Sequence, residues 1–243
     1  MSTIKTIFTI LEQKAALIAA IAAVVTCFLT ARELNSSADA FKKVSELWMS
    51  TNRPVICIER HQRLDDDGIN YNHEDCIVSN VGAAPRQFSC VDVKTYCAIT
   101  FCGHNVPNAI KTIVVPVMYY SYGLRSQGLT GTIYRCVGNN ASKKTFEFNK
   151  KCRDFGKANE MAVNAEMIIV AHVGYKDSFG VENELYYQLK SITGHREISK
   201  DNYDGYEMEA KAVKPEGGQV DIDNIDLPSI FTMHVQNSCN DDE

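Results

Sequence analysis

The sequence lacks the short motifs that mark common enzyme classes. It contains no Gly-x-Ser-x-Gly nucleophile elbow and no glycine-rich loop that could cradle a phosphate. Nothing local orients any of its six histidines beside a nucleophile. We therefore assign no catalytic residue, no metal ligand and no cofactor, and we expect a protein that is not an enzyme.

The sequence also lacks an evenly paired set of cysteines. Its nine cysteines are an odd number and are spread along the chain. Exported domains of this size more often have few cysteines or an even number that pair. The thiols therefore favour a reducing compartment for the part of the chain that carries them.

Charge is absent from residues 15–31, AALIAAIAAVVTCFLTA, and so are glycine and proline. A helix of this length spans roughly 26 Å, the short end of what crosses a bilayer core. The segment is apolar all round, whereas a helix in water would show a polar face. We predict a retained transmembrane helix. The alternatives are a signal peptide, cleaved after a small residue such as Ala31, and a buried core helix.

Basic residues flank this segment on both sides. Lys5 and Lys14 precede it, and Arg32, Lys42 and Lys43 follow it closely. Positive residues near a membrane helix tend to stay on the cytoplasmic side. Together with the thiols, the bases that follow the helix place the large domain in the cytosol.

The chain divides into four parts by pattern and charge. We predict a lead-in and transmembrane helix over 1–31, a juxtamembrane helix over 32–53 and a β domain over 54–214. Residues 215–243 follow as an acidic, partly disordered segment. Acidity gathers late in the chain, since residues 197–243 hold 12 Asp and Glu but only 3 Lys. Such asymmetry concerns partners and solubility rather than fold.

The juxtamembrane helix carries a repeated apolar spacing. Leu34, Phe41 and Trp48 lie seven residues apart. Such a stripe packs a helix on the following domain, or pairs it with the same helix of a second protomer. Homo-oligomerisation through the N-terminal helices is therefore one expectation.

From Val55 onward the pattern is typical of short strands separated by turn residues. We expect strands at 55–59, 76–81, 88–93, 96–101, 112–120, 132–137, 145–148, 167–175, 184–189 and 206–213. Pro116 lies inside one of them and indicates an edge or a bulge. Residues 149–164 fit a short helix or an irregular crossover. Many short strands with turns between them indicate a mainly β fold, a sandwich or barrel.

Arg53-Pro54 opens a strand after the anchor helix, a strand ends in the run 80–85, NVGAAP, and a late strand enters the run 175–180, YKDSFG. These three motifs resemble a diffuse group of bacterial single-pass membrane proteins that have an immunoglobulin-like β-sandwich and no assigned activity. The resemblance covers roughly residues 15–190. It implies an immunoglobulin-like sandwich and a bacterial inner-membrane location, and it carries over no catalytic residue.

Two clusters suggest metals but fit them poorly. In the loop around Gly68, Asp65, Asp67 and Glu74 match calcium-loop positions, but Arg63 stands where the first acidic ligand belongs. A solvated hairpin tip is the better interpretation.

The run Cys97-x4-Cys102-x-His104 suggests zinc, which needs four ligands at a structural site. Positions five apart on a strand point to opposite faces. Buried cysteines in a β core explain this run better.

A basic cluster is the most informative charge feature. It consists of Lys143, Lys144, Lys150, Lys151, Arg153 and Lys157. It is either a solvated surface or a contact for lipid headgroups or another anionic ligand, since cations near an anionic leaflet gain about 1 kcal/mol each. Nucleic acid is an unlikely partner because aromatic residues are not interleaved with these bases.

These features indicate a membrane-anchored binding or scaffolding protein that presents an interaction or sensor domain. Its partners would be the lipid bilayer and an unknown protein. One alternative is a ligand-sensing effector that oligomerises and perturbs the membrane. Another is a hydrolase or transferase whose site is assembled from distant residues.

The predicted orientation can be tested by thiol labelling. Intact cells that express the protein should label slowly with a membrane-impermeant thiol reagent, because the membrane shields cytosolic thiols. Permeabilised cells serve as the control and should label promptly. Prompt labelling of intact cells would reject the cytosolic orientation.

Overall fold

The computed structural model describes residues 37, 39–44, 47, 53–64, 72–104, 106–191 and 194–236. The chain forms two units, residues 1–52 and residues 53–243. In the first unit, residues 37, 39–44 and 47 are helical, and Phe41 is 76% exposed. The proposed anchor over 15–31, Leu34 and Trp48 lie outside the described residues. None of the helices that are described is both long and apolar enough to cross a bilayer.

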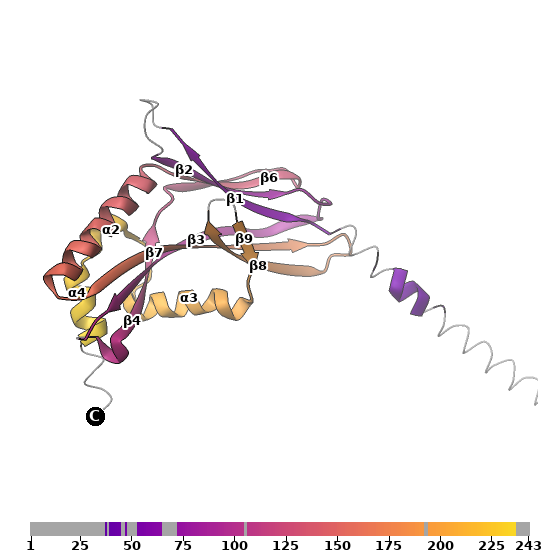
Figure 1. The fold of residues 1–243 in the computed structure, drawn as a ribbon. Coiled ribbons are helices and arrows are strands. Elements are labelled where there is room, and N and C mark those ends of the chain that lie inside the picture. The colour runs from indigo at the N-terminus through magenta and orange to yellow at the C-terminus, as the bar shows by residue number, and fades with distance from the viewer. Residues whose placement is uncertain are drawn as a thin grey trace, which may run out of the picture. The chain divides into compact units, whose positions relative to one another are not determined.

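The second unit is mainly β and contains two sheets, which confirms the predicted fold class at that level (Figure 1). The smaller sheet has the order β1-β2-β6-β5 and is antiparallel throughout. Its strands are β1 (Ile56–Arg63), β2 (His73–Asn80), β6 (Gly131–Gly138) and β5 (Tyr122–Arg125).

The larger sheet has the order β10-β4-β3-β7-β8-β9, and only β10 runs parallel to its neighbour, β4. Its strands are β10 (Val220–Asp221), β4 (Ile110–Met118), β3 (Gln87–Cys102), β7 (Ala162–Lys176), β8 (Glu182–Ser191) and β9 (Gly194–Glu197). The helical elements are η1 (Pro107–Ala109), α2 (Ala141–Ala158), α3 (Lys200–Val213), η2 (Ile222–Asn224), α4 (Leu227–Phe231) and η3 (Thr232–Gln236).

The long strands β3 and β7 organise three hydrophobic cores, because alternate residues of a strand point to opposite faces. On one face, the half of these strands that includes Val91 and Ile169 packs on the smaller sheet. The other half of the same face, which includes Ile99, packs on α2 and α4. The opposite face, which includes Tyr96, packs on α3, seen beneath the sheet in Figure 1.

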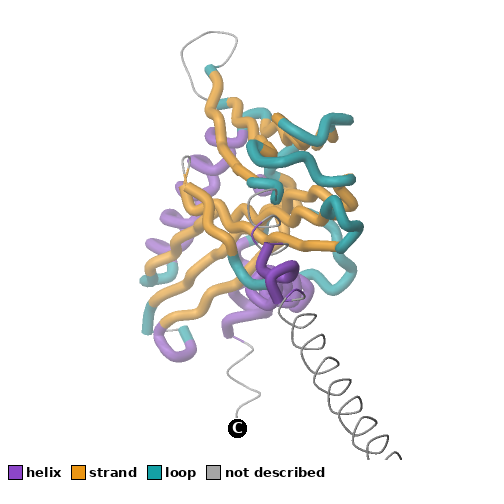
Figure 2. Tube along the Cα trace, turned by 90° about the vertical axis from the view of Figure 1, so that its right-hand side faces the viewer, coloured by secondary structure: helices purple, strands orange, loops and turns teal. Residues whose placement is uncertain are grey.

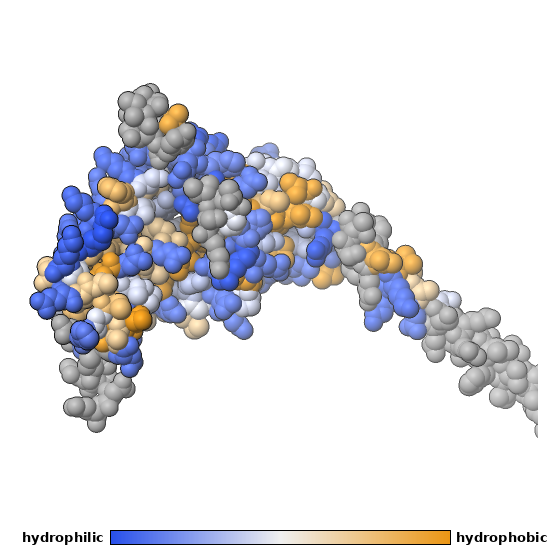
Figure 3. All heavy atoms as spheres, viewed as in Figure 1, coloured by the Kyte–Doolittle hydropathy of each residue, from blue (hydrophilic) through white to orange (hydrophobic). Residues whose placement is uncertain are grey.

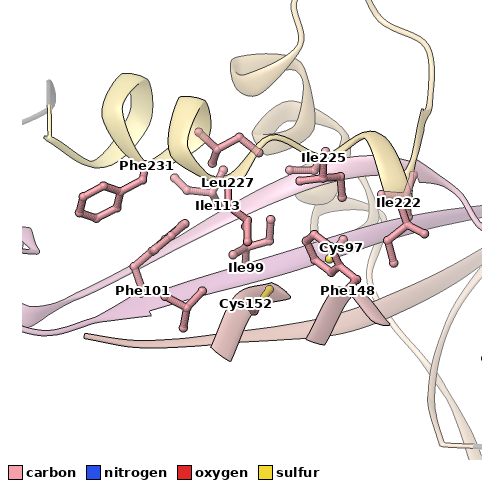
Figure 4. Close-up of a cluster of buried hydrophobic side chains, with 14 of the residues drawn as sticks. Cys97, Ile99, Phe101, Ile113, Phe148, Cys152, Ile222, Ile225, Leu227 and Phe231 are labelled. Atoms are coloured by element: carbon pink, nitrogen blue, oxygen red, sulfur yellow. The ribbon is translucent and has the colours of Figure 1, made fainter. Parts of the chain in front are cut away.

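The C-terminal segment, predicted to be partly disordered over residues 215–243, is described up to Gln236. Residues 215–236 are described and complete one core, as Figure 4 shows for Ile222, Ile225, Leu227 and Phe231 above Ile99. These apolar residues alternate with acids that remain at the surface. The net charge of the segment therefore gives no sign of its buried apolar face.

Two segments expected as strands are helical, and Figure 2 shows helices flanking the strands of both sheets. Residues 145–148 lie inside α2, where Phe148, Cys152 and Phe155 recur at helical spacing toward the core. Residues 206–213 lie inside α3, whose Ser199 side chain accepts a hydrogen bond from the Asn202 amide at 3.2 Å. This cap favours a helix start over a strand.

Pro116 lies at the point where β4 leaves β3. The two strands pair from Cys102 opposite Ile110 to Tyr96 opposite Pro116, and the pairing ends there. Proline has no amide hydrogen to donate to a ladder, so it is a natural place for pairing to stop. The chain then crosses to the smaller sheet and leaves residues 87–95 of β3 without a partner on that side among the described strands.

Packing of the C-terminal segment predicts a large effect of Phe231→Ala on stability. Phe231 is 5% exposed and its ring lies 5.3 Å from the ring of Phe101. The substitution should lower the free energy of unfolding by about 3–5 kcal/mol, measured by chemical denaturation. The control is Met233→Ala, because Met233 is 55% exposed, and it should change stability by no more than about 0.5 kcal/mol. Equal effects would contradict this packing.

Candidate functional site

A cleft opens at the free edge of β3, where β4 has turned away. Two cavities of about 280 and 250 Å³ lie there. They share Asp92, Val93, Thr95 and Gln219 as lining residues, so they meet at this edge. Each is close in size to a small-ligand pocket.

The first cavity lies between the sheet and the end of α3. Lys94 of β3 bonds Glu207 of α3 at 3.0 Å, and Lys211 bonds the same carboxylate at 3.0 Å. Both lysines hold the pKa of Glu207 below its usual value by hydrogen bonding. The loop that closes the cavity turns through Gly217 and Gly218, whose φ values of +70° and +83° suit glycine.

The second cavity is lined by hydroxyl and thiol groups of the crossover and of β6. Its polar side chains include Tyr119, Tyr120, Tyr134 and Cys136. Gly123 of β5 makes room for the Tyr134 ring, because a Cβ at that position would lie 1.8 Å from the phenol oxygen. Because Tyr119 and Tyr120 donate their hydroxyl hydrogens to Glu74, their oxygens can only accept further hydrogen bonds inside the cavity.

Asp92 lies where the two cavities meet. Its side chain is on the α3 face of β3, directly across the β3–β7 pair from His172. The residue is half-buried, yet no described residue donates a hydrogen bond to its carboxylate or forms an ion pair with it. Lys94 attracts this carboxylate electrostatically. A cavity-lining carboxylate without a hydrogen-bond donor can accept a hydrogen bond from a ligand.

A buried ion pair holds the far wall of the second cavity. Glu74 of β2 is fully buried, and Arg60 of β1 donates to its two carboxylate oxygens at 2.8 and 2.7 Å. The Tyr120 hydroxyl donates to the same carboxylate at 2.7 Å and the Tyr119 hydroxyl at 3.3 Å. The crossover is therefore fixed to the smaller sheet through both phenols.

The thiol and phenol groups of the cleft are protonated at neutral pH. Burial raises the pKa of Cys136 to about 12 and that of Tyr119 to about 12. Burial also raises the pKa values of Tyr120 and Tyr134 well above the usual value for a tyrosine hydroxyl. A thiol is nucleophilic as the thiolate, so these groups suit hydrogen bonding to a ligand rather than nucleophilic attack.

The structure separates the six basic residues of the predicted cluster, all on α2, into two sets. Lys144 pairs with Asp221 at 2.8 Å, and Lys151 donates to the Asp223 carbonyl at 3.1 Å. These two lysines attach the C-terminal segment to α2. Lys143, Lys150, Arg153 and Lys157 are exposed and make no ion pair with any described residue. In Figure 3, hydrophilic residues gather over α2 at the left of the view.

The clusters weighed for metals are not assembled as metal sites. Glu74 is bonded to Arg60, and residues 65–71 lie outside the described chain. Cys97 is buried while Cys102 is exposed, which fits side chains on opposite faces of β3. Within the described ranges, no three His, Cys, Asp or Glu side chains are placed to hold a metal ion.

Sequence reasoning did not single out Asp92, Lys94 or Glu207. Asp92 lies within FSCVDV, whose alternation predicts only a strand. The sequence signal for a site is that two charged residues, Asp92 and Lys94, precede Tyr96 on the strand face that is otherwise apolar. Their relation to Glu207, 113 residues from Lys94, depends on tertiary folding.

Comparisons with known proteins add no further constraint. No protein-family model, curated protein or solved structure matches this chain significantly. The function is therefore inferred from the residues and charges that line the cleft.

Glu74→Gln should destabilise the protein strongly, because it leaves the Arg60 guanidinium in a largely buried position without its counter-charge. We expect the free energy of unfolding to fall by about 3–5 kcal/mol in chemical denaturation. The control is Glu59→Gln, since the Glu59 side chain is 61% exposed and bonds only His61, and it should cost no more than about 0.5 kcal/mol. A small effect of Glu74→Gln would refute this role of the ion pair.

Proposed function

We propose that this protein is a membrane-anchored binding protein whose β domain holds a small polar ligand in the cleft at Asp92. The observation that carries the proposal is the unpartnered, half-buried carboxylate at the junction of two cavities. A ligand that supplies hydrogen-bond donors or positive charge would remove the cost of that burial.

The fully buried acids of the described chain, Glu74 and Asp75, have partners that the half-buried Asp92 lacks. Glu74 is satisfied by Arg60 and two phenols, and Asp75 by Arg63 and Arg135. Native proteins normally pair their buried charges in this way. Asp92 departs from the pattern at the place where space for a ligand exists, which favours binding as the reason for the departure.

Protonated phenols and thiols around the cleft favour binding over catalysis. Burial keeps Cys136 and Tyr119 neutral well above physiological pH. Neutral hydroxyl and thiol groups can orient a ligand but supply no activated nucleophile. We therefore prefer a binding or sensor role to the alternative of a hydrolase or transferase.

Placement at a membrane is the second part of the proposal and rests on the apolar sequence of residues 15–31. We propose a single-pass anchor in a bacterial inner membrane, with the β domain in the cytosol. Face-to-face contact between the two sheets supports the sandwich as the architecture of half of this domain. An immunoglobulin-like relationship stays a proposal, as does pairing of the N-terminal helices through Leu34, Phe41 and Trp48.

The exposed face of α2 favours a second contact, with anionic lipid headgroups. Lys143, Lys150 and Lys157 lie seven residues apart and so share one stripe, beside Arg153. Phe146 is 66% exposed on the same side of the helix. Cations around an exposed aromatic side chain suit a membrane surface, although Glu147 and Asp154 on this side reduce the net charge.

Asp92→Asn tests whether Asp92 is kept for binding or for stability. The substitution removes a partly desolvated charge that has no partner, so the free energy of unfolding should rise or change by no more than about 0.5 kcal/mol. The control Asp75→Asn removes a buried acid that has arginine partners, and it should cost about 2–3 kcal/mol. Comparable losses for both variants would show that Asp92 is structural.

A further inference from the structure

We propose that the ligand of the cleft is a small zwitterion, with an ammonium group at Asp92 and a carboxylate or other anionic group at Lys214. This inference rests on the proposed binding function and assigns the charge pattern of the ligand. Its basis is the set of charges that line the larger cavity.

Five charged side chains line this cavity, and three of them already form a closed set. Glu207 accepts from Lys94 and from Lys211, both at 3.0 Å. These hydrogen bonds lower the pKa of Glu207, so its carboxylate stays ionised beside the two ammonium groups. With Asp92, which also attracts Lys94, the cavity lining holds three lysines and two acids, so it keeps a surplus of one positive charge.

The remaining two side chains carry opposite charges and are not part of that set, although Asp92 also attracts Lys94 electrostatically. Asp92 and Lys214 both line the same cavity of about 280 Å³. Neither makes an ion pair or a side-chain hydrogen bond with a described residue, so they do not pair with each other either. Two opposite charges that face one cavity without meeting can both be satisfied by one molecule placed between them.

The surface between these two charges is mainly apolar. Val93, Tyr96, Pro116 and Ala210 line the cavity, and Tyr96 and Ala210 are buried. This surface suits a short hydrocarbon chain between the two charged ends of a ligand.

Opposite charges at separate ends select against ligands with one charge. A simple amine would satisfy Asp92 but leave Lys214 and the surplus positive charge of the lining without an anion. A simple carboxylate would do the reverse and place its apolar end against the Asp92 carboxylate. Leaving a desolvated charge unpaired lowers affinity, so the zwitterion should bind more tightly than either.

The experiment uses three probes that differ only in their end groups: ε-aminocaproate, hexylamine and caproate. Full-length protein in detergent micelles is titrated with each probe by isothermal titration calorimetry, and protein-free micelles supply the blank. We expect ε-aminocaproate to bind at least about ten-fold more tightly than either single-charge probe.

Two substitutions assign the ends of the ligand. Asp92→Asn should weaken ε-aminocaproate at least about ten-fold without weakening caproate, whereas Lys214→Gln should weaken ε-aminocaproate without weakening hexylamine. Asp154→Asn and Lys157→Gln are matched controls on the exposed face of α2 and should have no effect. Circular dichroism spectra verify that every variant is folded.

The outcomes separate this inference from the proposed function. If hexylamine or caproate binds as tightly as ε-aminocaproate, and the Asp92 or Lys214 variant weakens it, the cleft binds a ligand of one charge and the zwitterion is overturned. If no probe binds, or if the variants bind every probe as the wild-type protein does, the zwitterion is overturned and the binding function loses its support at this cleft.

Discussion

The buried ion pair between Glu74 and Arg60 is the interaction on which the arrangement of the β domain depends. The pair lies inside the smaller sheet. The Glu74 carboxylate also accepts hydrogen bonds from the hydroxyl groups of Tyr119 and Tyr120, which belong to the crossover from the larger sheet. A fully buried carboxylate is tolerated only when its oxygens are bonded, so the crossover can occupy few other positions. The same contact that satisfies the charge therefore sets the distance between the sheets and holds one wall of the cleft.

The cleft itself follows from the end of a strand pairing. Pro116 closes the β3–β4 ladder, and the chain must then leave the larger sheet to reach the smaller one. The open edge of β3 is covered by α3 on one face and by the fixed phenols on the other. Polar groups in both walls are satisfied by neighbours, whereas Asp92 and Lys214 are not. The hydrogen bonds and ion pairs of the domain hold the walls of the cleft. The two remaining charges, Asp92 and Lys214, line the space between the walls.

The sequence predicted the parts of the fold that local pattern controls. Alternation in strands such as 96–101 and 112–120 indicated a mainly β domain. Pro116 indicated an edge or a bulge, whereas β4 lies between β10 and β3 and its pairing with β3 ends at Pro116 without a bulge. Helices α2 and α3 were missed in part, because 145–148 and 206–213 alternate like strands over a few residues. The longer periodicity of α2 and the Ser199 cap of α3 favour helices. The cleft was not predicted, since Lys94 and Glu207 are 113 residues apart and no local motif relates them. The acidic composition of the C-terminal segment did not indicate that its residues Ile222 and Phe231 pack into the core.

Hydrogen exchange followed by mass spectrometry can show whether a ligand binds in the cleft, because it reports which segments of the full-length protein a ligand protects. With ε-aminocaproate added, slower exchange should appear in peptides that cover residues 92–96 and 207–219, which line the larger cavity. Peptides from the exposed face of α2 should exchange at the same rate with and without the ligand. Protection confined to α2, or unchanged exchange at both linings of the cleft at saturating ligand, would contradict the assignment of this cleft as the binding site.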